Sequence, residues 1–76
     1  MKIRYDPESD ALVIHLRVGT KVEHTEALED DERILIDYDA DDRAVAFEIL
    51  EATEVLGGEV KVELELPVAA RKSPSG

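Results

Sequence analysis

Alternation of apolar and polar residues dominates this chain and predicts a β-rich protein. A period of two, filled with β-branched and aromatic residues, is typical of strands that lie with one side on a core. The more polar stretch of residues 21–28 is also interpreted as a strand. The segments with the clearest alternation are residues 3–5, 12–16, 34–38, 45–49 and 60–66.

Turn-forming residues separate the predicted strands. The sequence Asp6-Pro7-Glu8-Ser9 matches a type I turn, in which Asp caps nearby amides and Pro fixes φ. Residues 39–42 are expected to form a second acidic turn, and glycines mark further reversals at 19 and 57–58. Residues 50–56 are helix formers followed directly by glycine, so they predict one short helix.

The first hairpin matches a later one after a shift of 33 residues, which brings Tyr5 onto Tyr38 and Asp6 onto Asp39. The shared Tyr-Asp positions favour a genuine repeat over a chance likeness of two amphipathic hairpins. The predicted fold class is therefore α+β, mostly antiparallel β: a meander of two repeated hairpins plus a C-terminal strand, with one short helix. Residues 1–66 are expected to form a single β-rich domain, and residues 67–76 a flexible C-terminal tail.

The chain length makes self-association the expected source of extra stability. A domain of 76 residues buries a small share of its surface and has a marginal core. The absence of cysteine removes disulfides and thiolate metal sites. We therefore expect a homodimer or a higher homo-oligomer.

The charge balance excludes several partners. Nineteen acidic residues against nine basic ones give a formal net charge of −10, which excludes nucleic acid and disfavours anionic membranes. No apolar run is long enough for a transmembrane helix or a signal peptide, so a cytoplasmic protein is expected. The lack of Asn and Gln and the 37% of charged residues suggest a thermophilic protein.

Three stretches of the sequence are characteristic: IRYDPESDALVI at residues 3–14, ILIDYD at residues 34–39 and FEIL at residues 47–50. They resemble a known family, named domain of unknown function 2283, and the resemblance covers about residues 1–54. Asp42 and Ala46 stand where glycines are usual in that family, and Val13 where Tyr is common. The resemblance implies a small bacterial or archaeal protein without established activity, so no catalytic or binding residue is carried over. Some members lie beside small toxin-like genes, which implies an antitoxin-like role.

The pattern closest to a metal site spans residues 37–48. Asp37, Asp39, Asp41 and Glu48 supply oxygens at positions 1, 3, 5 and 12 of an EF-hand loop. The position that requires glycine is Asp42, and both flanks alternate as strands. An acidic turn in solvent is therefore favoured over a calcium site, and no metal or cofactor is predicted.

His15 and His24 are the only imidazoles of the chain. A two-residue turn at Gly19-Thr20 would make them face each other, whereas a three-residue loop brings His15 opposite Glu23. The second register is preferred because it pairs apolar residues. Two histidines without a third ligand make a weak metal site, so they are interpreted as exposed strand residues.

No catalytic site is predicted, and the protein is not expected to be an enzyme. Tyr5 and Tyr38 are interpreted as residues at the edge of the core, with buried rings and solvent-exposed hydroxyl groups. The serines lie in a turn and in the tail, and the chain has no Gly-rich phosphate loop. Six short strands hardly enclose a cleft.

The outer sheet face is expected to carry apolar residues that need a cover. These residues are Val13, Leu35, Ala44, Ala46 and Leu50. The short helix and a second subunit are expected to cover them. The predicted strand at residues 60–66 is the best candidate interface element, paired within the chain or exchanged with a partner.

Charge and size together favour a non-catalytic interaction or regulatory module. The leading hypothesis is a homo-oligomer that neutralises a basic partner protein, because opposite charges steer such an encounter. The alternative is a divalent-cation or small-ligand binding protein that uses the acidic turns.

Overall fold

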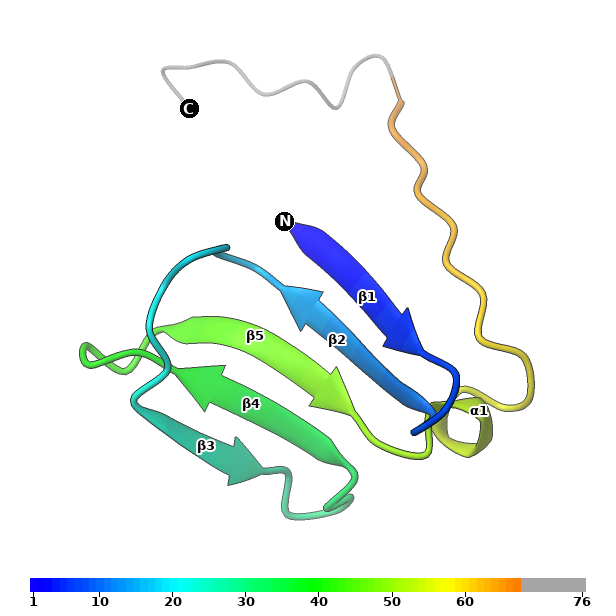
Figure 1. The fold of residues 1–76 in the computed structure, drawn as a ribbon, viewed down its shortest axis with the longest axis horizontal. Helices are drawn as coiled ribbons and strands as arrows, with labels where there is room; N and C mark the ends of the chain where they lie inside the picture. The colour runs from blue at the N-terminus through cyan, green and yellow to red at the C-terminus, as the bar shows by residue number, and fades with distance from the viewer. Residues whose placement is uncertain (68–76) are drawn as a thin grey trace.

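The computed structural model describes residues 1–67, which contain one antiparallel five-stranded sheet and one short helix (Figure 1). The predicted α+β, mostly antiparallel class is confirmed. Apart from Pro67, the predicted tail lies outside the described residues. The elements are β1 (Lys2–Asp6), β2 (Ala11–His15), β3 (His24–Ala27), β4 (Ile34–Tyr38), β5 (Ala44–Ile49) and α1 (Ala52–Val55).

The strands lie in the order β1-β2-β5-β4-β3, which differs from a simple meander at one connection. β2 pairs with β5, and the chain crosses from β2 to the far edge of the sheet before β3 begins (Figure 1). The three strands that are rich in large apolar residues, β2, β5 and β4, thereby lie in the interior of the sheet. The polar strands β1 and β3 become the edges, where exposed backbone is best tolerated by charged side chains.

The two repeated hairpins are present and have the same register. Ile3 pairs with Ile14 in the first hairpin, and Ile36 pairs with Phe47 at the equivalent positions of the second. The register shifts at Asp37/Tyr38, so Tyr38 pairs with Ala44. Such a bulge bends the strand and increases its twist.

A pseudo-two-fold axis relates the hairpins. Ile14 and Phe47 are equivalent under the shift of 33 residues, and they are also direct partners across the β2–β5 pair. A pair of equivalent residues that face each other marks the axis. The repeat therefore gives a pseudo-symmetric four-stranded core of β1, β2, β5 and β4, to which β3 is added.

The turns of the two hairpins use the same capping contact. Asp6 Oδ1 accepts a hydrogen bond from the backbone N–H of Glu8 at 3.0 Å, and Asp39 Oδ1 accepts one from Asp41 at 2.8 Å. A short Asp side chain that binds the amide two residues later stabilises a turn without help from the rest of the fold. The predicted acidic turns are confirmed at both places.

The sheet has two distinct faces. The face that we call the apolar face carries Ile3, Tyr5, Leu12, Ile14, Ile34, Ile36, Phe47 and Ile49. The opposite face, which we call the polar face, contains two rows that each cross all five strands. These rows are Lys2–His15–Ala46–Asp37–Thr25 and Arg4–Val13–Glu48–Leu35–Ala27.

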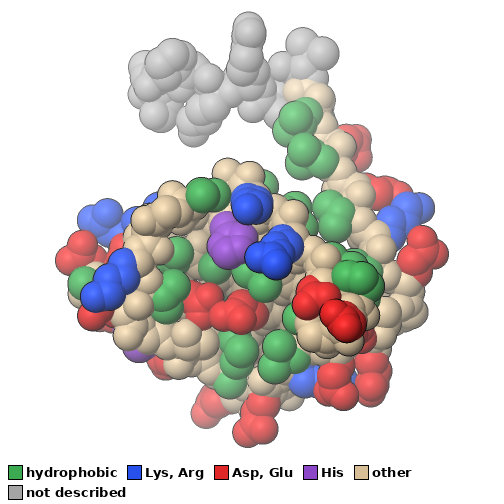
Figure 2. All heavy atoms as spheres, in the orientation of Figure 1, with side chains coloured by type: hydrophobic (Ala, Val, Ile, Leu, Met, Phe, Trp, Pro, Cys, Tyr) green, Lys and Arg blue, Asp and Glu red, His purple; other side chains and the backbone are tan. Residues whose placement is uncertain are grey.

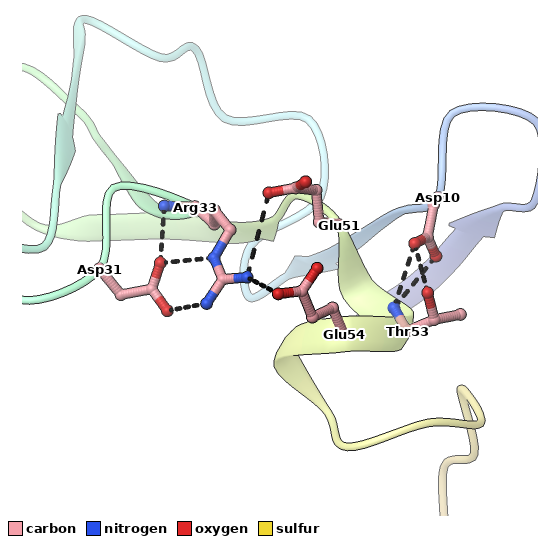
Figure 3. Close-up of polar contacts among 6 residues, drawn as sticks. All are labelled: Asp10, Asp31, Arg33, Glu51, Thr53 and Glu54. Carbon is pink, nitrogen blue, oxygen red and sulfur yellow. Dashed lines mark hydrogen bonds and ion pairs between the residues drawn. The ribbon is translucent and has the colours of Figure 1, made fainter.

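Helix α1 lies at the end of the sheet beside the β1–β2 turn and covers neither face (Figure 1). The residue before it, Glu51, is the N-cap; it has a left-handed backbone (φ 49°) and gives no side-chain cap. The cap comes from Asp10, which accepts hydrogen bonds from the N–H and the hydroxyl of Thr53 at 3.1 and 2.6 Å (Figure 3). The predicted helix is confirmed in place, although it is shorter than residues 50–56.

Arg33 ties the β3–β4 loop to the same helix (Figure 3). Its guanidinium donates to both oxygens of Asp31 at 2.9 and 3.0 Å. It also lies 3.3 Å from Glu54 and 4.0 Å from Glu51.

None of the described residues forms a helix long and apolar enough to span a membrane.

The predicted C-terminal strand is not formed. Residues 60–67 do not form a strand, and all of them except Val60 are exposed. Gly57 and Gly58 both have positive φ, at 84° and 135°, and the chain after them runs away from the sheet (Figure 1). An alternating segment gains stability as a strand only when its backbone pairs with a neighbour, and within residues 1–67 this segment has none.

Candidate functional site

A pocket of about 330 Å³ opens on the polar face of the sheet. Figure 2 shows this face, with acidic, basic and histidine side chains gathered over the middle of the sheet. The lining comes from all four strands of the pseudo-symmetric core and from the β1–β2 turn. The lining residues are Arg4, Asp6, Ser9, Ala11, Val13, His15, Asp37 and Glu48.

Small side chains create the hollow. Ala46 pairs with both His15 and Asp37, so a methyl group separates two larger polar side chains in one row. In the next row, Glu48 stands between Val13 and Leu35. The pocket therefore has an apolar floor and polar walls, as binding sites for small molecules usually do.

Asp37 and Glu48 form the acidic wall of the pocket. They occupy diagonal positions on neighbouring strands, close enough for side chains to meet. Asp37 is only 6% exposed, and its Oδ1 accepts a hydrogen bond from the hydroxyl of Thr25 at 2.6 Å. Contact with the Asp37 carboxyl, and then burial, raises the pKa of Glu48 to about 6. Below that pH, Glu48 carries a proton that it can donate to Asp37.

The opposite wall is built mainly by β1, which supplies the Arg4 guanidinium and the Asp6 carboxylate. Arg4 pairs with Val13, which lies between Arg4 and Glu48 in the row across the sheet. Asp6 lies beside it, and its carboxylate accepts a hydrogen bond from the hydroxyl of Ser9 at 3.0 Å. This bond, the Glu8 amide and the charge of Arg4 lower the pKa of Asp6. A bound molecule would thus meet two carboxyl groups at one end, and a guanidinium next to a carboxylate at the other.

The EF-hand-like residues do not converge on one point. Asp37 and Glu48 lie on the sheet, whereas the Asp39 carboxylate accepts hydrogen bonds from the N–H groups of Asp41 and Arg43 and from Arg17. The Arg43 amide and the Arg17 guanidinium hold the pKa of Asp39 down at about 2. Among residues 1–67, no three His, Asp or Glu side chains are arranged to hold a metal ion.

Both predicted registers of the histidines are wrong, because β5 and β4 lie between β2 and β3. His15 lines the pocket. His24 stacks on Tyr38, with ring centroids 4.9 Å apart, and lies 3.2 Å from Glu26. The two imidazoles therefore have separate surroundings.

The tyrosines are half-buried, as expected for the edge of the core. The Tyr5 hydroxyl donates a hydrogen bond to Asp10 at 2.7 Å. This bond and burial raise the pKa of Tyr5. Tyr5 thus belongs to the contacts that hold the β1–β2 turn and α1 together, and it does not line the pocket.

The sequence points to Asp37 and Glu48 only as the first and last positions of an EF-hand-like loop, and not as a pair on neighbouring strands. A usable signal was present: both acids occupy positions in apolar strands, and the repeat carries the register of the first hairpin over to the second. In that register, Glu48 faces Leu35 and is diagonal to Asp37. The pocket itself depends on the β2–β5 pairing, which the local pattern does not specify.

An open antiparallel sheet with one end-capping helix defines a small α+β protein. The chain belongs to the family described as protein of unknown function (DUF2283), whose family model matches residues 2–52. The match spans the whole sheet and the start of α1, in agreement with the resemblance seen in the sequence. No curated protein and no solved structure is significantly similar to this chain.

Proposed function

We propose that this protein is a non-catalytic protein-interaction module that acts as a homo-oligomer. The observation that carries the proposal is the segment of residues 59–66, which alternates like a strand but has no pairing partner within residues 1–67. Val62, Leu64 and Leu66 are 55%, 74% and 75% exposed. A continuous row of large apolar side chains in water marks a binding surface.

The edge strand β1 of a second copy fits this segment best. β1 has Ile3 and Tyr5 on the apolar face, and Lys2 and Arg4 on the polar face. An added strand would place its apolar side chains next to Ile3 and Tyr5, and its glutamates next to Lys2 and Arg4. The other edge, β3, has Glu26 and offers no lysine or arginine, so it attracts the acidic segment less. Addition of a strand to a free edge is a common mode of recognition.

The small core gives an independent reason for assembly. Within residues 1–67, the well-shielded apolar side chains are Leu12, Val45, Ala46 and Ala52, and no large side chain is completely buried. A sheet with so few shielded residues and without disulfides gains stability when a partner covers it.

The proposed target of the assembled module is a basic protein, in an antitoxin-like role. The support is the net charge of −10 and the exposed acidic stretch formed by residues 23–32. Opposite charge steers such an encounter and makes it sensitive to salt. Capture from native lysate at about 50 mM salt, followed by release of a basic protein at about 500 mM, would support this target, and a salt-insensitive partner would contradict it.

Light scattering at about 100 μM tests the assembly, with matched serine substitutions on the two sides of the segment. The full chain should have at least twice the monomer mass of 8.4 kDa. Leu64→Ser should shift it toward the monomer, whereas Glu63→Ser should leave the mass unchanged. A monomeric full chain, or equal effects of both substitutions, would overturn the proposal.

A further inference from the structure

The acidic wall of the polar-face pocket has no cation beside it. Arg17, Arg33 and His24 pair with other acids, and no ion pair within residues 1–67 includes Asp37 or Glu48. Apart from its contact with Glu48, Asp37 accepts a hydrogen bond from the Thr25 hydroxyl, on the side away from β5. A deeply buried carboxylate that touches a second carboxyl is therefore open toward the pocket.

We propose that this pocket binds a small molecule through a protonated primary amine that lies between the carboxylates of Asp37 and Glu48. An ammonium group has three donors and a compact charge, which suits two carboxylates that converge from neighbouring strands. The pocket volume of about 330 Å³ is at the lower end of the range for ligand sites and suits a molecule of metabolite size. The inference is independent of the proposed assembly.

Electrostatics favours a cation at this place. Two carboxylates in contact cannot both ionise cheaply, so a proton occupies the pair at mildly acid pH, in keeping with the pKa of about 6 for Glu48. An ammonium group supplies the positive charge of that proton and is attracted by both carboxylates. The other charged or titratable groups that line the pocket are His15, Arg4 and Asp6. Binding should therefore release a proton from Glu48 and strengthen from pH 5 to pH 7.5.

The rest of the pocket suits an alkyl chain. Ala11 and Val13 of β2 form an apolar strip between the acidic wall and the wall that carries Arg4 and Asp6. A short alkylamine can lie along this strip with its ammonium group at Glu48 and its alkyl chain directed toward the far wall.

Amide NMR of the full chain at pH 7.5 tests the proposal, with n-butylamine hydrochloride as the probe and tetramethylammonium chloride as a matched cation without N–H donors. Saturable shifts are expected at Val13, Ala46 and Glu48 with the amine alone. Asp37→Asn and Glu48→Gln should each weaken binding at least tenfold. Glu29→Gln, which removes one exposed acid from the loop after β3, should leave binding unchanged.

The variants are judged on spectra that show a folded protein before amine is added. Glu48→Gln keeps the shape of the side chain and decides the test alone if Asp37→Asn unfolds. Absence of saturable shifts at the pocket, equal shifts with tetramethylammonium, or unchanged affinity in a folded Glu48→Gln variant would each overturn the proposal.

Discussion

Aspartate side chains perform two separate tasks in this small sheet. Asp6 and Asp39 start equivalent turns by accepting an amide two residues ahead. Asp10 instead reaches Thr53, 43 residues away, and caps α1. The first task was predictable from sequence, because the Tyr-Asp repeat encodes a local contact. The second was not, because it depends on how β2 and β5 bring distant residues together.

Glu48 should give the stability of the protein a distinctive pH dependence. Its pKa is raised from 4.5 to about 6 in the folded state. The folded state thus binds the proton more tightly than the unfolded chain, so this contribution is complete below pH 4.5 and is lost as the pH rises through about 6. Solvent screens the partly exposed pair, so the contribution is at most about 1 kcal/mol.

Urea unfolding of the wild type and of Glu48→Gln at several pH values measures this effect. The neutral Gln does not titrate, so the variant should gain stability relative to the wild type as the pH rises from 4.5 to 6.5. A difference between the two proteins that stays constant over this range would show that Glu48 does not titrate as described.

The Tyr5–Asp10 contact makes a second prediction at the residue scale. Asp10→Ala removes the hydrogen-bond acceptor that raises the pKa of Tyr5, so the phenol should ionise at a lower pH. Absorbance titration of the two tyrosines at 295 nm measures this. Asp41→Ala, an exposed acid in the equivalent turn of the second hairpin, serves as the control. A shift of the same size in the control would contradict the assignment to Asp10.

At the scale of elements, the sequence pattern predicts each strand of the sheet and the helix but not their spatial order. Alternation identifies which residues share a face, and the repeat predicts two hairpins of equal register. It does not say that β2 pairs with β5, because that choice depends on the burial of Leu12, Val45 and their neighbours at the centre of the sheet. The error about the histidine registers has the same cause.

Leu12, a large buried side chain of β2, allows a test of the position of β2 in the interior of the sheet. It is 4% exposed, and Leu12→Ala should lower the free energy of unfolding by about 2–5 kcal/mol because it leaves a cavity. Val18→Ala, in the exposed loop after β2, should change it by less than about 0.5 kcal/mol. Urea unfolding measures both, and similar losses would contradict the central position of Leu12.

At the scale of the whole molecule, one open sheet leaves two surfaces with different roles. The polar face contains the pocket, and the segment of residues 59–66 leaves the fold beyond α1 with its apolar side chains in water. The alternation of this segment predicts a strand, which the described residues of a single chain do not form. Its partner was not predictable, because a strand pattern specifies the faces of a segment and not the edge that it joins.

The pairing of this segment with β1 of a second copy is best tested by cross-linking between two cysteine variants of different mass. The chain has no cysteine, so Ile3→Cys and Leu64→Cys each introduce a single thiol. The two variants, one with a mass tag, are mixed and treated with a short bifunctional thiol reagent whose reach tolerates a small shift of register.

The main covalent product is expected to join one Ile3→Cys chain to one Leu64→Cys chain. Glu8→Cys in place of Ile3→Cys should form much less of this product. The opposite result is a mixture that stays uncross-linked, while a chain with both Ile3→Cys and Leu64→Cys closes onto itself as a monomer. That outcome would show that the segment pairs within its own chain, and it would contradict the proposed assembly.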